Sequence, residues 1–247
     1  MVKIAVVTCV FLLEFNELDT PSSNFDKCSN FDYYLFTNNK HLVSNLSDKW
    51  TIVEVKCDNV KNGVYLTKYI KWLTHECLPD YDIIIWVDSF IVPNHLKIND
   101  IKLIAEQCLN NELNTPIFMR TQKFKCIKDD INWCVANNRL TDHMASKITD
   151  YFEKVEAFPI TDPVQTYWSS AMIKNNKNIR LQKLSKDLFQ YITNICYRDQ
   201  HILPVLFKKY NINCKIIPST HNPNIDEIFI NKGKQNINNH NYSDKIK

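Results

Sequence analysis

Residues 81–93 read YDIIIWVDSFIVP, and this stretch decides the fold. Residues 83–87 are apolar, and all but Trp86 are β-branched, which is typical of a short strand buried on both faces of a sheet. Asp88 follows where the apolar run stops. A carboxylate at the C-terminal end of a buried parallel strand points into the crevice where open α/β sheets bind ligands, and it suits Mg²⁺ or Mn²⁺. The alternative is an aspartate that ends the strand and caps the next turn.

The rest of the chain alternates between strand and helix patterns. Further strands are expected at residues 3–10, 32–37, 50–55, 115–120, 166–173 and 215–218, and helices at residues 41–48, 64–77, 98–109, 123–136, 142–153, 184–197 and 201–210. This order predicts an α/β fold, a single Rossmann-like domain whose mostly parallel central sheet is covered by helices on both faces. We expect residues 1–228 to form this domain and the Asn- and Lys-rich residues 229–247 to be a disordered tail.

Composition excludes several classes of protein. A net charge of +3 is too small to indicate a nucleic-acid or membrane surface. The two glycines, Gly63 and Gly233, cannot form a P-loop or a Gly-x-Gly-x-x-Gly turn, so side chains, a metal or ordinary backbone N–H groups must hold any nucleotide. The nine cysteines form no Cys-x-x-Cys pair, which favours a reduced, cytoplasmic chain. Residues 4–13 are apolar but too short to span a membrane, and no small-residue cleavage site follows them.

Several stretches, in sequence order, carry a resemblance to a known family. Residues 68–73 read KYIKWL and precede the strand that ends in Trp86-x-Asp88. Residues 120–130 contain KCI, residues 168–180 follow as a strand and turn, and residues 197–200 read YRDQ. Together these stretches resemble the glycosyltransferase-like family related to the plant mucilage and pectin biosynthesis proteins.

The resemblance implies a GT-A fold and a glycosyltransferase that moves a sugar from a nucleotide-diphosphate sugar, a UDP-sugar above all, to a glycan or other hydroxyl acceptor. In GT-A enzymes an Asp-x-Asp at the end of the aspartate strand binds a divalent metal, Mn²⁺ or Mg²⁺. This chain has Asp88-Ser89-Phe90, so one carboxylate is missing. A single carboxylate, the diphosphate and another side chain can still form a magnesium site that keeps several waters.

Glycosyl transfer builds charge on the leaving diphosphate, and this chemistry assigns roles to residues of the resembling stretches. Asp88 fits the metal, and Lys68 or Lys71 fits the phosphates, although a solvated helix face is the alternative for both lysines. Thr8, at the end of the first strand, is a further candidate for cofactor binding. His221 follows the last strand, where many GT-A enzymes place a metal-binding histidine; an exposed loop histidine is the alternative.

The remaining candidates concern the acceptor and the sugar. Asp199 is the candidate base for the acceptor hydroxyl, with an N-cap of the next helix as the alternative. Trp168 can stack on a sugar ring, or it is a core tryptophan. The neighbouring residues complete the expected substrate-binding set: Ser169, Ser170, Arg198 and Gln200.

Two other functions compete with the enzyme. A catalytically inactive GT-A-like module that binds a glycan or a protein is suggested by Phe90. A nucleotidyltransferase with a similar sheet is disfavoured, because its Gly-rich phosphate loop is absent.

Overall fold

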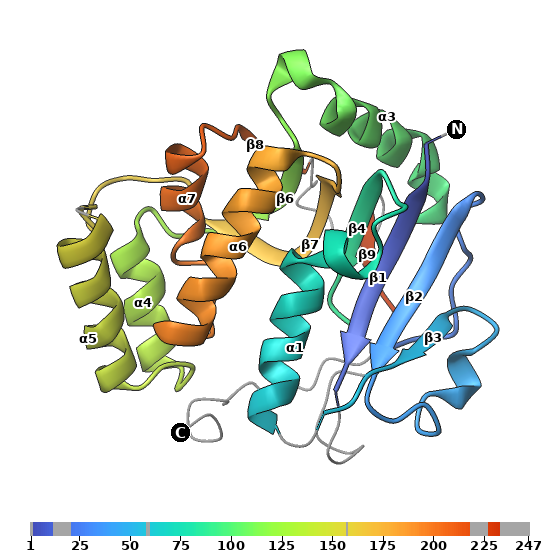
Figure 1. Ribbon diagram of the computed structural model, residues 1–247, viewed down its shortest axis with the longest axis horizontal. Coiled ribbons are helices and arrows are strands. Elements are labelled where there is room, and N and C mark those ends of the chain that lie inside the picture. The colour runs from blue at the N-terminus through green and yellow to red at the C-terminus, as the bar shows by residue number, and fades with distance from the viewer. Residues whose placement is uncertain (1, 12–20, 58–59, 157, 218–226, 233–247) are drawn as a thin grey trace.

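The computed structural model describes residues 2–11, 21–57, 60–156, 158–217 and 227–232. Its centre is a seven-stranded sheet in the order β3-β2-β1-β4-β7-β6-β8 (Figure 1). β7 is antiparallel to both of its neighbours and all other pairs are parallel, which confirms the α/β fold with a mostly parallel sheet. The strands are β1 (Ile4–Val10), β2 (Phe31–Thr37), β3 (Thr51–Glu54), β4 (Ile83–Val87), β6 (Ile117–Thr121), β7 (Tyr167–Asn175) and β8 (Cys214–Ile216).

Helices cover both faces of the sheet, because side chains alternate along the buried strands. Along β1, Val7 and Cys9 face the core beneath α1, α6 and α7, whereas Val6 and Val10 face the core beneath α3. In Figure 1, α1 and α6 lie in front of the sheet and α4 and α5 stand beside its β6–β8 end. No helix in the described part of the chain is long and apolar enough to cross a membrane. The helices are α1 (Val60–Trp72), α2 (Thr74–Cys77), α3 (Ile98–Leu109), α4 (Ile127–Ala136), α5 (Asp142–Tyr151), α6 (Ile179–Asn194) and α7 (Leu203–Lys209).

The helix expected at residues 64–77 is interrupted at Leu73, which separates α1 from α2. Side-chain groups donate hydrogen bonds to the last backbone carbonyls of α1. The Thr74 hydroxyl donates to the Ile70 carbonyl at 2.6 Å, and Lys174 Nζ donates to the carbonyls of Lys71 and Trp72 at 2.6 and 3.2 Å. The helix therefore ends where its carbonyls find side-chain donors.

The prediction of a helix at residues 41–48 is wrong, since this stretch contains only a 3-10 turn at Ser44–Leu46. Side chains before it accept backbone N–H groups: Thr37 Oγ1 from Asn39 and Asn39 Oδ1 from His41. Such local bonds compete with helical ones. The other boundary differences are smaller; α6, for example, begins five residues earlier than expected, after Asn178, whose side chain accepts the Leu181 N–H.

The domain boundary expected after residue 228 is too early. β9 (Phe229–Asn231) pairs with β5 (Ile91–Pro93) in a second, two-stranded sheet. Phe229 is buried in the core beneath α3. Residues 229–231 therefore belong to the folded domain, while residues 233–247 of the expected tail lie outside the described residues.

Candidate functional site

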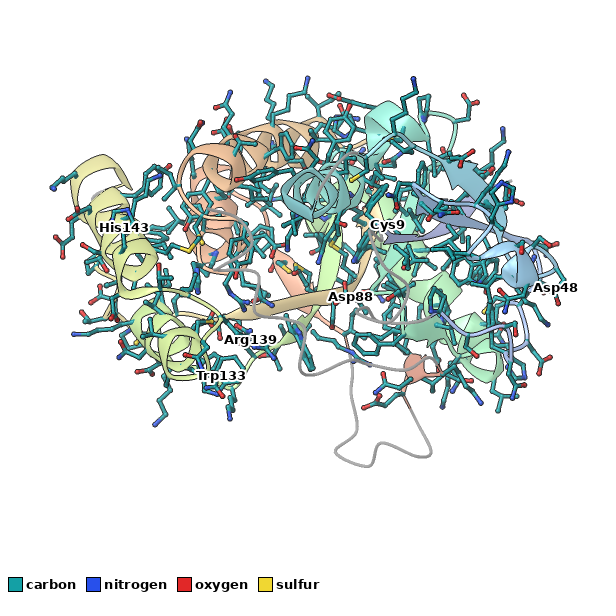
Figure 2. The ribbon with its side chains drawn as sticks, turned by 90° about the horizontal axis from the view of Figure 1, so that it is seen from below. Cys9, Asp48, Asp88, Trp133, Arg139 and His143 are labelled. Atoms are coloured by element: carbon teal, nitrogen blue, oxygen red, sulfur yellow. The ribbon has the colours of Figure 1, made fainter. Side chains whose placement is uncertain are left out.

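The sheet has a topological switch point between β1 and β4. From β1 the chain adds β2 and then β3 on one side, and later places β4 on the other side of β1. Open α/β sheets bind ligands outside the carboxyl ends of the strands at such a point. Cys9, near the end of β1, and Asp88, just past β4, flank it; Figure 2 labels both side chains near the middle of the molecule. The negative charge of Asp88 acts on the Cys9 thiol, so the two groups are close in space.

Backbone bonds on two sides fix the position of Asp88. Its N–H donates to the Ser170 carbonyl of β7 at 2.7 Å, and its carbonyl accepts the Ile91 N–H at 2.8 Å. Backbone atoms therefore close the following turn, and the carboxylate does not cap it. Instead Oδ1 accepts the Trp86 indole N–H at 3.1 Å. The side chain is 36% exposed, and burial raises the pKa of Asp88 although Lys71 and Lys68 oppose this shift.

A buried network around Asp199 stands next to Asp88. Lys68 Nζ lies 2.8 Å from Asp199 Oδ1, and Oδ2 accepts the Trp72 indole N–H at 2.8 Å and the Ser169 hydroxyl at 3.0 Å. Burial disfavours the charged forms of both Lys68 and Asp199, and it lowers the pKa of Lys68. The lysines and hydrogen bonds outweigh burial at the carboxylate, so the pKa of Asp199 lies well below its usual range.

This environment changes the role of Asp199. The N-cap alternative is wrong, because Ile202 occupies that position of α7 and no side chain caps it. The expected role as a base is also not supported, since the carboxylate is only 2% exposed and both oxygens already accept hydrogen bonds. Asp199 is instead the counter-charge that holds the lysines of α1.

Lys71 links the two carboxylates. Its Nζ donates to the Ser169 hydroxyl at 2.9 Å and lies 3.6 Å from Asp199 Oδ2 and 3.9 Å from Asp88 Oδ1. Lys71 is buried and the Lys68 side chain is 17% exposed, so the solvated-face alternative is wrong for both lysines. Lys71 is in place to orient Asp88, and Lys68 keeps a small exposed surface toward solvent.

An irregular stretch of β7 presents Trp168. The register against β6 jumps from Met119↔Met172 to Arg120↔Trp168, so residues 169–171 bulge out of the pairing. A bulge redirects side chains, and here Trp168 is 43% exposed, so its core alternative is wrong. Ser169 joins the Asp199 network, and the buried hydroxyl of Ser170 has no hydrogen-bond partner among the described residues.

Three expected site residues, Thr8, Arg198 and Gln200, are not brought to Asp88. Thr8 is buried with the even-numbered side chains of β1, which face away from α1, and Cys9 takes its expected place. Arg198 Nη2 donates to Gln200 Oε1 at 2.6 Å, and the guanidinium feels the charge of Asp130 on α4. His221 lies outside the described residues.

Arg120 is a site residue that the sequence did not single out. It lies at the end of β6, where Nη2 is 3.3 Å from Glu227 Oε2 and donates to the Phe229 carbonyl at 3.1 Å. Burial lowers the pKa of Arg120, while the charges of Glu227 and Asp88 act in the opposite direction. Arg120 therefore adds a third cation beside Asp88. The signal was present: a charged residue closing an apolar strand, the same rule that selects Asp88.

Phe90, the residue in place of the second carboxylate, points away from this site. It is buried in the core beneath α3, which lies on the opposite face of the sheet from α1. Phe90 therefore contributes to this core and not to the site at Asp88.

No protein-family model matches the chain, and no curated protein matches it. The residues at the switch point therefore have to carry the functional assignment.

Proposed function

We propose that the protein is a nucleotide-sugar-dependent glycosyltransferase of the GT-A type, which binds the donor diphosphate at the carboxyl ends of β1 and β4. The observation that carries this proposal is the partly exposed Asp88 carboxylate at the switch point, held by backbone bonds to β7 and β5 and faced by cations. The division of the sheet also supports it. β1–β4 precede Asp88 on the side where the resemblance expects the nucleotide, and β6–β8 follow it on the side expected for the acceptor.

The charges at this edge suit a diphosphate leaving group. Three cations, Lys68, Lys71 and Arg120, face three carboxylates, Asp88, Asp199 and Glu227, so the charges balance and each cation is held in place by a partner. Oriented cations in a poorly solvated site stabilise the charge that develops as the glycosidic bond to the diphosphate breaks. Lys68 and Arg120 are the two that retain exposed surface.

The residues fit a weakly held divalent ion and not an all-protein cage. Asp88 supplies one carboxylate, and its Oδ1 already accepts the Trp86 N–H, which leaves Oδ2 for Mg²⁺ or Mn²⁺. Such an ion keeps several waters and is bound together with substrate phosphates. When bound, it would neutralise charge on the diphosphate. Lys71 holds the carboxylate in place for this role.

Trp168 supports the acceptor side of the proposal. Its exposed indole lies on β7 directly opposite Arg120 in the strand register. An exposed aromatic face is suited to stack on a sugar ring. We therefore assign Trp168 to binding a glycan or sugar and not to the fold.

Calorimetric titration of UDP with and without Mn²⁺ tests the proposal. Asp88→Asn should weaken Mn²⁺-dependent UDP binding by at least about tenfold, because it removes the charge that attracts the cation. Asp82→Asn is the matched control: this aspartate precedes the same strand, and its Oδ2 accepts the Lys3 N–H at the opposite edge of the sheet. It should bind UDP as the wild type does.

A second candidate is the inactive GT-A-like module that binds a glycan or a protein partner. The buried Phe90 and the fully engaged Asp199 favour it, because they remove a second metal ligand and a base. A wild-type protein that binds no UDP in the presence or absence of Mn²⁺, and hydrolyses no nucleotide sugar, would select this candidate.

A further inference from the structure

A second cluster of metal-ligating side chains lies between α4 and the segment before α7. Asp130 and Cys134 are four residues apart on α4 and so project from one face of the helix. His201 meets them from the other segment, with Nε2 3.4 Å from Asp130 Oδ2, and Cys134 Sγ lies 3.5 Å from Asp130 Oδ1. One ligand atom from each residue lies within 4.8 Å of the others, and all three residues are buried.

His201 is the observation that requires an explanation. Both ring nitrogens are buried, and neither has a hydrogen-bond partner among the described residues. A buried polar group without a hydrogen-bond partner lowers the free energy of unfolding, so native proteins seldom contain one. An imidazole nitrogen is a common zinc ligand, so a bound metal would supply the missing partner.

We propose that Asp130, Cys134 and His201 bind one zinc-like divalent transition-metal ion, with a water in the fourth position. The oxygen, sulfur and nitrogen donors suit Zn²⁺, whereas Mg²⁺ and Ca²⁺ prefer oxygen alone. Tetrahedral Zn²⁺ bonds place neighbouring donor atoms roughly 3.5 Å apart. The Asp130 carboxylate lies near this distance from both other ligands, through Oδ2 to His201 and through Oδ1 to Cys134. The site is separate from Asp88 and does not depend on the proposed function.

Charge balance is compatible with such an ion. On binding, the Cys134 S–H bond breaks, the sulfur electron pair forms the bond to the metal, and the proton leaves to solvent. The thiolate and the Asp130 carboxylate then supply two negative charges against the divalent ion, and the guanidinium groups of Arg198 and Arg139 also act on both ligands. The nearby Arg198 guanidinium stays partnered to Gln200 Oε1, so it is not forced onto the metal.

The ion would attach α4 to the chain two residues beyond Asp199. Figure 2 labels Trp133, the neighbour of Cys134, on the side of Asp88 away from Asp48, so the metal would brace the helical side of the molecule. Its structural effect would reach the Asp199 network through the short connection from His201.

Metal content and cobalt spectroscopy test this proposal on the full chain. Protein purified after growth with zinc should contain one zinc per chain, and Co²⁺ exchange should give a thiolate-to-cobalt charge-transfer band. Cys134→Ser should abolish the band and reduce bound zinc from one to near zero. Cys108→Ser is the matched control, because this buried cysteine lies on α3 at the other face of the sheet; it should keep the band and the zinc.

X-ray absorption at the zinc edge keeps the test decisive if Cys134→Ser does not fold. The wild type should show one sulfur at about 2.3 Å and nitrogen or oxygen ligands at about 2.0–2.1 Å. Absence of zinc from the wild type at saturating micromolar Zn²⁺ would overturn the proposal. So would two or more sulfur ligands, or an unchanged cobalt band in Cys134→Ser.

Discussion

At the scale of single residues, burial decides what the carboxylates near the switch point can do. Asp88 keeps one oxygen free of side-chain hydrogen bonds and a partly exposed side chain, whereas Asp199 is enclosed by Lys68, Trp72 and Ser169. A base must reach the acceptor proton, and the enclosed carboxylate does not. Of the two, Asp88 is available to a ligand and Asp199 holds the lysines.

Asp199→Asn should therefore destabilise the protein by about 3–5 kcal/mol, because it leaves the buried Lys68 without its counter-charge. Urea unfolding measures this change. The control is Asp187→Asn, whose carboxylate pairs with Lys209 at the surface of α6 and should cost about 1 kcal/mol or less. Wild-type stability combined with lost transfer activity would instead restore Asp199 as the base.

Phe90→Asp is a second test at this scale. A second carboxylate in the Asp-x-Asp pattern would tighten metal binding only if position 90 faced the site, and Phe90 is buried beneath α3. The variant should lose at least about 3 kcal/mol of unfolding free energy, since it removes a core aromatic and buries a charge. Phe90→Leu, the conservative control, should cost about 1 kcal/mol. Normal stability with tighter Mn²⁺ binding would contradict the placement of Phe90.

The sequence could predict some of the residues that gather at the site but not how they pair. Strand-end placement selected Asp88, and the family resemblance selected Lys68, Lys71 and Asp199. Lys68 and Asp199 are 131 positions apart, and no local pattern reveals that their charges meet. The placement of Thr8 failed for a simpler reason: a one-residue shift along a strand moves a side chain to the other face, and Cys9 is the residue that faces α1.

At the scale of elements, the end of α1 depends on a lysine from β7. Lys174 is buried, and its Nζ donates to two carbonyls in the last turn of α1. Burial lowers the pKa of Lys174 to about 7. Periodicity could not predict this end of the helix, because the side chain that ends it arrives a hundred residues later.

This lysine should make stability depend on pH. The folded pKa of about 7 lies below the unfolded value of about 10.4, so between these limits the unfolded chain binds more protons. The unfolding free energy should therefore rise, by about 2 kcal/mol from pH 7 to pH 9 relative to Lys174→Met. The control is Lys183→Met, on the exposed face of α6. Its unfolding free energy should depend on pH as that of the wild type does. If the unfolding free energies of the wild type and Lys174→Met changed with pH in parallel, Lys174 would stay charged in the folded protein.

The sheet itself was largely predictable, with exceptions that have physical causes. The apolar run at 83–87 matches β4 residue for residue, because a strand buried on both faces has an unambiguous pattern. The antiparallel direction of β7 was not predictable, since alternation along a strand carries no information about direction. β5 was missed because it follows directly on the turn after β4, and β9 because it falls in the Asn- and Lys-rich stretch that we expected to be a tail.

At the scale of the whole molecule, the chain returns near its C-terminus to the turn that follows Asp88. β9 pairs with β5, and Asn94 Nδ2 donates to the Glu227 carbonyl. The same segment holds Arg120 through the Glu227 carboxylate and the Phe229 carbonyl. Residues from β4, β6 and the C-terminal segment thus meet at one edge of the sheet.

The consequence can be tested at Phe229, which is buried and lies beneath the Arg120 guanidinium at 5.9 Å from its ring centroid. Phe229→Ala should cost about 3–5 kcal/mol in urea unfolding, because it empties a core position. Phe229→Leu keeps most of the buried volume but removes the ring beneath Arg120. On the proposed function, Phe229→Leu should lose less stability than Phe229→Ala yet bind UDP several-fold more weakly. The reason is that Arg120 loses its cation–π contact, which contributes about 0.5–1 kcal/mol. Ile230→Ala, on the same strand but only half-buried, should leave UDP binding unchanged. Wild-type stability in Phe229→Ala would show that β9 is dispensable for the fold, and equal UDP affinity in Phe229→Leu would remove Arg120 from the donor site.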